Sequence, residues 1–254
     1  MLHLIDYFIY HQGNNWKECR EFPPHSVTDE DGFLAAGGNF DPSLLYKAYH
    51  NGIFPWPNEE ADLIWWFSPE ERFVLYPQEF HIPTSLKRTM RHHDLELRTD
   101  TAFREVMTNC AHSLRPICEG EPNSPKYAAS WILPQMIDGY EGLFKQGIAH
   151  SIEAWQNGEL VGGFYGVSVG SIFCGESMFT KVDDASKIAL AFFVPIARKA
   201  GFQLIDCQAQ TNNLARFGAR LIPRDTYLEH VNELGQKEID WNLVKQALQE
   251  LNHA

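Results

Sequence analysis

Two carboxylates and one carboxamide stand in an apolar part of the chain, where they could act on a small ligand. Glu176 follows the run S-I-F-C-G, and both Asp206 and Gln208 lie in L-I-D-C-Q, which comes after a long apolar segment. Charged groups leave water only where something pairs with them. Apolar walls with a few convergent polar groups are typical of a small-molecule site. We therefore expect a ligand with an apolar side chain beside a polar, cationic amine.

The same residues also allow a purely structural interpretation. Glu176 could brace a turn beside Gly175, and Asp206 could end a buried strand by hydrogen bonding to the next loop. Spacing alone does not separate this interpretation from a ligand site. If the segment is extended, Asp206 and Gln208 face the same side because they are two residues apart.

Cap and turn signals predict a small N-terminal α/β domain over residues 1–70. Asp41 and Pro42 start a helix, and Gly52 ends it. The aromatic and proline-rich run over 53–69 is expected to form a packed loop rather than regular structure. This domain would precede a larger one over residues 71–254.

Strands and helices are expected to alternate in the larger domain. Asn157-Gly158 is a strong hairpin signal between two apolar runs. Pro195 stands inside an apolar helical segment and predicts a kink or an early end. The other expected elements are a helix starting at Thr99 or Asp100, a loop over 113–126, a helix from Pro134 to Gly147, a strand over 171–175, a helix over 185–200 and a strand over 202–206.

Composition excludes several classes of protein. The 254 residues are enough for one large or two unequal domains. No apolar run approaches the roughly 18 residues that cross a bilayer, and the N-terminus lacks the features of a signal peptide. The five cysteines form no C-x-x-C pair, which favours a reducing, cytoplasmic location. The histidines show no metal-ligand spacing, so no metal site is predicted.

One basic cluster stands out in an acidic chain. The net charge is −12, which argues against indiscriminate binding to nucleic acid. Lys87, Arg88 and Arg91 share one side of a predicted helix and could dock one folded RNA. The alternative is a solvated helical face.

Four motifs carry a resemblance to a known family. N-G-I-F-P-W at 51–56, S-W-I at 130–132, G-G-F-Y-G-V at 162–167 and the segment around Glu176 resemble those of leucyl/phenylalanyl-tRNA–protein transferases. The similarity extends from about Phe22 to Tyr227. It implies a GNAT-type acyltransferase domain with a mixed, largely antiparallel sheet, so the expected fold class is α+β.

The resemblance implies an enzyme that transfers Leu, Phe and Met from aminoacyl-tRNA to the N-terminal Arg or Lys of acceptor proteins and so creates a degradation signal. No cofactor is required because converting an ester to an amide is downhill. An acyl-CoA-dependent transferase would need a glycine-rich turn, whereas K-V-D-D-A-S-K at 181–187 has no glycine and two acids. A non-enzymatic adaptor for basic N-termini is the other alternative. A monomer without membrane contact is expected.

The resemblance also implies roles for individual residues. Glu176 would pair with the α-ammonium of the aminoacyl group or help to fix the ester, while Asp206 and Gln208 would orient or activate the attacking amine. Lys87, Arg88 and Arg91 would hold the acceptor stem. The apolar pocket and the adenine-stacking surface would be formed by Trp56, Trp131, Phe164, Met178, Phe179, Phe193 and Ile205.

The chain departs from its relatives at three places. Phe164 stands where related sequences often have Met, and Asn213 stands where many have His. W-W-F-S-P carries one residue more than the usual W-W-S-P. None of these changes touches the two carboxylates or the carboxamide.

Overall fold

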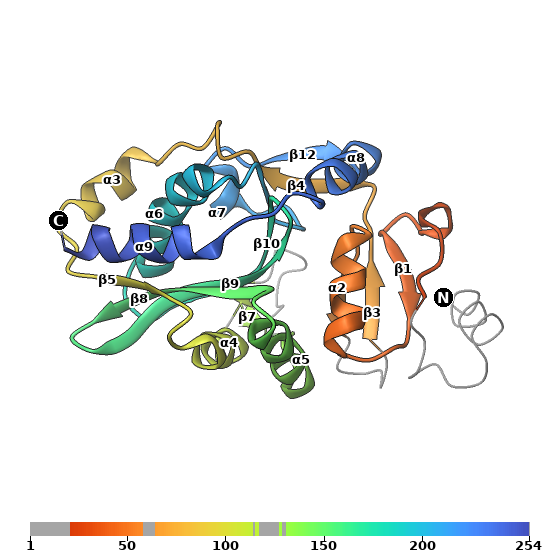
Figure 1. The fold of residues 1–254 in the computed structure, drawn as a ribbon, viewed down its shortest axis with the longest axis horizontal. Coiled ribbons are helices and arrows are strands. Elements are labelled where there is room, and N and C mark those ends of the chain that lie inside the picture. Colours follow the sequence, from red (N-terminus) through yellow and green to blue (C-terminus); the bar gives the residue numbers. More distant parts are fainter. Residues whose placement is uncertain (1–20, 58–63, 114, 117–126, 129–130, 254) are drawn as a thin grey trace.

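The computed structural model describes residues 21–57, 64–113, 115–116, 127–128 and 131–253 (Figure 1). The N-terminal segment, Cys19, Cys118 and most of the predicted loop over 113–126 lie outside these residues. The larger part is built on a seven-stranded sheet whose strands lie in the order β12 (Arg220–Pro223), β4 (Glu71–Leu75), β11 (Leu204–Asp206), β10 (Ile172–Thr180), β9 (Glu159–Val169), β8 (Ala149–Gln156) and β5 (Glu96–Thr99). Only β10 and β11 pair in parallel, so the expected mixed, largely antiparallel sheet is confirmed.

The N-terminal part has its own three-stranded sheet. Its strands lie in the order β1 (Phe33–Ala36), β3 (Ile64–Phe67) and β2 (Phe54–Pro57), beside α2 (Pro42–His50) and a short 3-10 helix, η2 (His25–Val27). All described pairings are antiparallel, so this part is α+β and the expected α/β class is wrong.

The run over 53–69 is not a loop throughout, as the sequence suggested. β2 and β3 pair so that Phe54 lies opposite Phe67 and Trp56 opposite Trp65. Aromatic pairs across neighbouring strands stabilise a sheet. The prolines of β2 are tolerated because this strand is at the edge.

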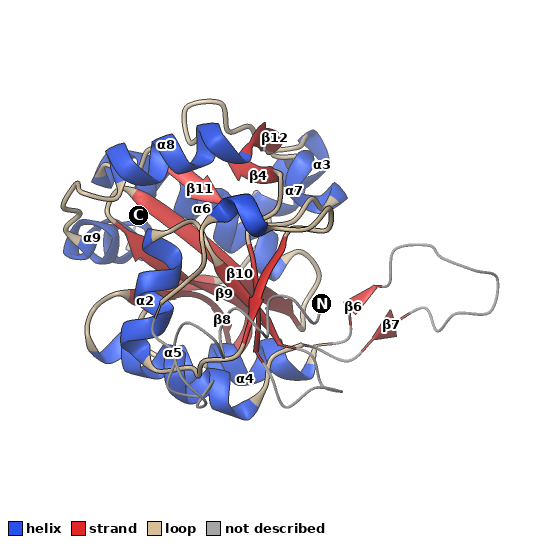
Figure 2. Ribbon diagram, turned by 90° about the vertical axis from the view of Figure 1, so that its right-hand side faces the viewer, coloured by secondary structure: helices blue, strands red, loops and turns tan. Residues whose placement is uncertain are grey.

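Helices cover both faces of the large sheet. The helices are α3 (Thr84–Met90), α4 (Phe103–His112), α5 (Pro134–Lys145), α6 (Ala185–Ala200), α7 (Asn212–Ala215), α8 (Arg224–Leu234) and α9 (Trp241–Asn252), and a short ribbon pairs β6 (Arg115–Pro116) with β7 (Tyr127–Ala128). α6 and α9 pack on one face and α4 and α5 on the other (Figure 1). α2 packs against α5, which joins the N-terminal part to the larger one (Figures 1 and 2).

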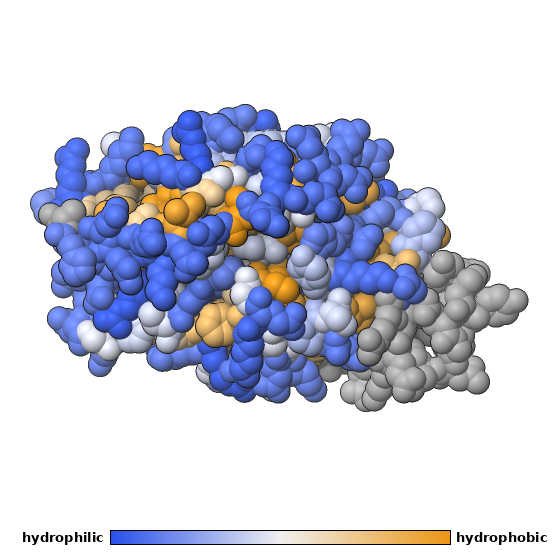
Figure 3. Space-filling model, viewed as in Figure 1, coloured by the Kyte–Doolittle hydropathy of each residue, from blue (hydrophilic) through white to orange (hydrophobic). Residues whose placement is uncertain are grey.

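Two hydrophobic cores result. The α5-side core contains, among others, Tyr49, Tyr140 and Phe179, and therefore draws on both parts of the chain. The α6-side core contains Phe164, Phe193 and Ile205. Hydrophilic residues cover most of the face seen in Figure 3, and hydrophobic residues show between them near α6.

Most predicted elements are present, with shifted ends. Asp41 caps α2 by accepting a hydrogen bond from the Ser43 amide at 2.9 Å. The early end at Pro195 is wrong because α6 continues to Ala200. Val194 and Ala197, on either side of the proline, are fully buried, and that packing outweighs the hydrogen bond that proline cannot donate.

Candidate active site

Glu176 occupies a β-bulge between β10 and β9. Gly175 pairs with Gly166 and Ser177 with Tyr165, so Glu176 is the extra residue without a partner in the register. A bulge bends its strand and can re-aim a side chain. The strand expected over 171–175 continues beyond this bulge to Thr180. The bulge directs the Glu176 carboxylate towards the tyrosines of α2 and α5.

Two tyrosines and one glutamine surround the Glu176 carboxylate. The Tyr49 hydroxyl donates to Oε1 at 2.6 Å, the Tyr140 hydroxyl donates to Oε2 at 3.1 Å, and Gln208 Nε2 donates to Oε1 at 2.5 Å. The two tyrosine hydroxyls also hydrogen-bond to each other. Glu176 is therefore contacted from α2, α5 and the loop after β11.

Counting hydrogens in this cluster indicates a protonated carboxyl. Three contacts join the Tyr49 hydroxyl, the Tyr140 hydroxyl and Glu176. Each contact needs one hydrogen, and each tyrosine supplies one. When Glu176 is protonated, Tyr49 donates to Oε1, Tyr140 donates to Tyr49 and Oε2 donates to Tyr140, so each contact has a hydrogen. When Glu176 is ionised, one of the three contacts lacks a hydrogen.

Burial also favours the protonated form of Glu176. It raises the pKa of the Glu176 carboxyl to about 7, although the hydrogen bonds from Tyr49, Tyr140 and Gln208 favour the charged form and oppose that rise. Burial and the negative charge of Glu176 also raise the pKa of both tyrosines. The hydroxyls therefore stay protonated, while Glu176 changes charge near neutral pH.

Gln208 lies just beyond the end of β11 in a strained conformation. Its φ of +59° is in the left-handed region, which non-glycine residues rarely adopt. The Gln208 amide donates to Asp206 Oδ1 at 2.9 Å, which stabilises this turn. The expectation that Asp206 and Gln208 share one side of an extended strand is therefore wrong, because the strand ends at Asp206.

Asp206 is fully buried and forms an ion pair with Arg72 of β4. Arg72 Nε donates to Oδ1 at 2.8 Å and Nη2 donates to Oδ2 at 2.7 Å. The Tyr227 hydroxyl donates to Oδ2 at 2.8 Å. Burial alone would lower the pKa of Arg72, but the neighbouring carboxylate raises it above the usual value, so the guanidinium stays charged. Both oxygens of Asp206 are therefore bonded inside the protein, and Oδ1 also accepts from the Gln208 amide.

Arg72 also reaches the N-terminal part. Its guanidinium lies 4.4 Å from the centre of the Phe54 ring and 4.6 Å from that of Tyr227. Nη1 donates to the Gly52 carbonyl at 3.4 Å. Gly52 and Phe54 belong to the N-G-I-F-P-W motif, so one buried cation links that motif to the loop that carries Gln208.

A pair of tryptophans stands on the N-terminal side. Trp56 and Trp131 stack with ring centres 5.6 Å apart and planes 25° apart, and 41% of Trp56 is exposed. An exposed stacked pair offers a flat aromatic surface to a ligand. The structure thus brings together two residues that lie far apart in the sequence.

The other predicted pocket residues lie on two faces of the sheet. Phe164 and Phe193 contact each other at 5.4 Å between ring centres in the α6-side core, which also contains Ile205. Met178 is half-buried against the same core. Phe179 lies in the α5-side core instead.

Sequence reasoning missed four residues of the site: Tyr49, Tyr140, Arg72 and Tyr227. Tyr140 lies in the helix expected from Pro134, but helical spacing does not reveal the partner of its hydroxyl. Arg72 did carry a signal, because it is a charged residue in a strand that continues with the apolar run F-V-L. A buried arginine in such a strand requires an acid nearby.

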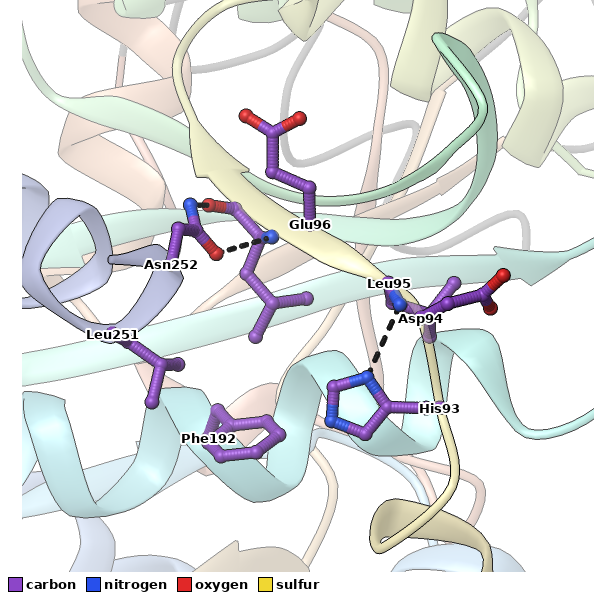
Figure 4. A pocket seen from close by; sticks show the side chains of 8 residues that line it. His93, Asp94, Leu95, Glu96, Phe192, Leu251 and Asn252 are labelled. Atoms are coloured by element: carbon purple, nitrogen blue, oxygen red, sulfur yellow. Dashed lines mark hydrogen bonds between the residues drawn. The ribbon is translucent and has the colours of Figure 1, made fainter. Parts of the chain in front are cut away.

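A separate hollow of about 320 Å³ lies at the far edge of the sheet, lined by residues of β5, α6 and α9 (Figure 4). Asn252 Oδ1 accepts from the Leu97 amide at 3.0 Å, and its Nδ2 donates to the Leu97 carbonyl at 2.6 Å. The Asn252 side chain thus covers the open edge of β5, which would otherwise offer unpaired backbone groups. We assign this region a structural role.

Two features are absent from the residues that the structure describes. Within those ranges, no three His, Cys, Asp or Glu side chains come together in a way that could hold a metal ion. No described helix is long and apolar enough to cross a membrane.

Comparison with known proteins gives the family. The sequence model of the leucyl/phenylalanyl-tRNA protein transferases matches residues 74–232, and that of their N-terminal domain matches residues 38–70. These are aminoacyltransferases. This chain belongs to the leucyl/phenylalanyl-tRNA–protein transferase family.

Individual relatives are similar in sequence to this chain over most of their length. The leucyl/phenylalanyl-tRNA–protein transferase of Anaeromyxobacter sp. (strain K) is 45% identical over 207 residues, 82% of this chain and 84% of the relative. That of Nitrosomonas eutropha is 46% identical over 205 residues, 80% and 83% of the two chains. That of Laribacter hongkongensis is 44% identical over 219 residues, 85% and 89% of the two chains. A solved structure from Staphylococcus epidermidis, of unknown function, aligns with a TM-score of only 0.35 at 11% identity, over 75% of this chain and 68% of that one.

The titration of Glu176 predicts a pH effect on stability. The folded state retains a proton that the unfolded chain releases above about pH 4.5. The contribution of this proton to the free energy of unfolding is complete below that pH and is lost as the pH rises through about 7. Each unit of pKa difference corresponds to about 1.4 kcal/mol. We expect the free energy of unfolding of the wild type to fall relative to that of Glu176→Gln between pH 4.5 and 8.

Urea denaturation at several pH values measures this difference. The exposed Glu105→Gln on α4 is the matched control and should parallel the wild type throughout. Parallel curves for the wild type and Glu176→Gln would show that Glu176 titrates normally.

Proposed function

We propose that this protein transfers leucine, and also phenylalanine and methionine, from aminoacyl-tRNA to the N-terminal Arg or Lys of acceptor proteins, which marks them for degradation. The observation that carries the proposal is the contact between Glu176 and Gln208 in a member of this aminoacyltransferase family. The buried ion pair between Asp206 and Arg72 holds Gln208 in place. The exposed Trp56–Trp131 stack adds a surface for a nucleobase.

The reaction replaces an ester by an amide. The α-amine of the acceptor attacks the carbonyl carbon of the aminoacyl ester, the new C–N bond forms and the bond to the 3′ oxygen of the terminal adenosine breaks. The amine loses a proton and the leaving 3′ oxygen takes one up, so no cofactor is consumed. An α-amine has a pKa near 8, so part of it is already free base at neutral pH. Proximity and orientation then contribute roughly 7–11 kcal/mol.

Glu176 and Gln208 carry the polar part of this task. The positive charge of the bound α-ammonium favours the ionised form of Glu176, which then accepts a hydrogen bond from it. Tyr49 and Tyr140 hold the carboxylate in place. The Gln208 carboxamide orients the reacting groups. Asp206 and Arg72 are positioning residues because both are buried beneath Gln208.

The apolar side of the site selects the amino acid. Met178, Phe164, Phe193 and Ile205 belong to one side of the sheet, and we assign them to the side-chain pocket. A pocket that is merely apolar distinguishes a methylene by only about 1–3 kcal/mol. Exclusion of Ile and Val therefore depends on aromatic walls that crowd a branched β-carbon. Phe179, which lies on the other face, supports the strand.

Trp56 and Trp131 are assigned to the 3′ adenosine. Stacking of a base on an aromatic side chain contributes about 1–3 kcal/mol. Lys87, Arg88 and Arg91 lie on α3 and at its end, where they line a hollow of about 370 Å³. We assign this hollow to the acceptor stem of the tRNA.

Several broader features belong to the same proposal. They are a domain boundary near residue 70, a GNAT-type larger domain, a monomeric state and a cytoplasmic location. The turn before α6 supports an RNA-borne donor over acyl-CoA, because Asp183 and Asp184 stand where a pyrophosphate would need backbone amides and glycine.

Labelled leucyl-tRNA and a peptide beginning with Arg test the proposal. We expect label to enter the peptide without ATP or acyl-CoA. Gln208→Ala should lower kcat roughly 10²–10⁴-fold while leaving tRNA affinity near wild type. The exposed Gln210→Ala is the matched control and should leave the rate unchanged. Binding of the peptide without any transfer of label would instead identify an adaptor for basic N-termini.

Phe164 predicts a preference for leucine over phenylalanine. Its ring is packed against Phe173 and Phe193 and is stiffer than the methionine of related sequences. We expect Phe164→Met to raise transfer of phenylalanine relative to leucine severalfold. Competition between the two charged tRNAs measures this ratio. The exposed Leu243→Met on α9 serves as control, and a ratio that stays equal in all three proteins would place residue 164 outside the pocket.

A further inference from the structure

The hollow of about 370 Å³ on α3, which we call the α3 groove, is lined by three cations that have no acidic partner among the described residues. Lys87, Arg88 and Arg91 are exposed, and none forms an ion pair with a described residue. In a chain with a net charge of −12, carboxylates are plentiful and could have neutralised them. The groove therefore presents uncompensated positive charge.

Arg216 extends this surface towards the active site. It follows α7 directly, is exposed, and forms no ion pair within the described ranges. Its Nη2 lies 3.5 Å from Ser85 Oγ of α3. Figure 2 shows α7 beside α3. Ser85 lines the α3 groove and also a second, smaller hollow that Arg216 lines, so the two hollows share a wall.

The second hollow borders the strand that carries Glu176. Asn213 lines it together with Arg216, and Asn213 Nδ2 lies 3.8 Å from the sulfur of Met178. Met178 is two residues from Glu176 on β10. The second hollow thus joins Ser85 of α3 and Arg216 to Asn213, which contacts the strand that carries Glu176.

The other charges of this hollow cancel. Lys187 and Asp184 both line it, and Lys187 Nζ lies 2.7 Å from Asp184 Oδ1. That pair adds little net charge. Arg216 is consequently the cation available to an anionic ligand at this point.

We infer that Arg216 binds a phosphodiester of the unpaired 3′ end of the donor RNA, between the part held by α3 and the aminoacyl ester held at Glu176. The inference rests on the proposed function, which makes the donor an aminoacyl-tRNA. A single strand that leaves the α3 groove must carry its phosphates past Ser85 to reach the site. A guanidinium is suited to that contact because its N–H groups match phosphate oxygens in pairs.

An unpaired surface cation is not by itself evidence of a ligand. Arg198, near the end of α6, is also exposed and unpaired among the described residues, but it lines neither of the two hollows. Position rather than charge distinguishes Arg216. This difference makes Arg198→Gln the matched control for Arg216→Gln.

The experiment uses three donors with the full-length protein: leucyl-tRNA, a short leucyl oligonucleotide ending in C-C-A, and leucyl-adenosine without a phosphodiester. A charged hydrogen bond contributes about 1.5–3 kcal/mol, which is about tenfold or more in binding. Arg216→Gln should raise KM about tenfold for the first two donors and leave kcat/KM for leucyl-adenosine unchanged. For Arg216→Gln, the slope of log affinity for leucyl-tRNA against log salt concentration should become shallower by about 0.7. Arg216→Lys should recover part of the loss.

The outcomes separate this inference from the proposed function. If the wild type transfers leucine from none of the three donors, the proposed function fails and the inference with it. If the wild type is active and Arg216→Gln behaves like Arg198→Gln with all three, only the inference is overturned. An equal loss with leucyl-adenosine would also overturn it, because that donor has no phosphate for Arg216 to bind.

Discussion

The buried ion pair between Arg72 and Asp206 is the interaction on which the rest of the site depends. It joins the neighbouring strands β4 and β11, accepts a hydrogen bond from the Tyr227 hydroxyl of α8, and donates one to the Gly52 carbonyl of the N-terminal part. Removing one partner of such a pair typically costs about 3–5 kcal/mol, because the other charge stays buried. The pair also has a geometric consequence, since the oxygen that binds Arg72 Nε also fixes the Gln208 amide.

Gln208 and Glu176 are each held in an unusual backbone setting. Gln208 has a left-handed conformation, and Glu176 is the extra residue of a bulge. Unusual conformations persist only where the surroundings over-determine them, and they gather at functional sites. Here the surroundings are the Asp206 carboxylate on one side and the two tyrosines on the other. The result is a carboxyl group with a pKa of about 7 beside a fixed carboxamide.

The sequence predicted the elements with strong local signals. The capped helix after Asp41, the hairpin at Asn157-Gly158 and the helix that begins at Pro134 need only neighbouring residues to specify them. The strands over 53–69 were missed because their stability comes from pairing with each other rather than from their own residues. The Glu176 bulge was missed for a similar reason, since a register exists only between two strands.

The arrangement of the candidate site was only partly accessible to sequence analysis. Glu176 and Gln208 contact each other, and Trp56 stacks on Trp131, while the roles of these residues stay predictions. Local periodicity placed Asp206 and Gln208 on one strand face, which is wrong because a side chain to backbone hydrogen bond turns the chain at that point. The burial of Asp206 and its link to Arg72, 134 residues away in sequence, depend on tertiary structure that no local pattern reveals.

One comparison tests whether the buried pair positions Gln208 or only stabilises the fold. Arg72→Met/Asp206→Asn removes both charges and keeps an oxygen that can accept from the Gln208 amide, whereas Arg72→Met/Asp206→Leu removes the acceptor as well. Both variants avoid an unpaired buried charge, and urea denaturation gives the folded fraction of each. Measured as kcat per folded protein with leucyl-tRNA, the Asn variant is predicted to exceed the Leu variant at least tenfold. Equal kcat in the two variants would contradict the account.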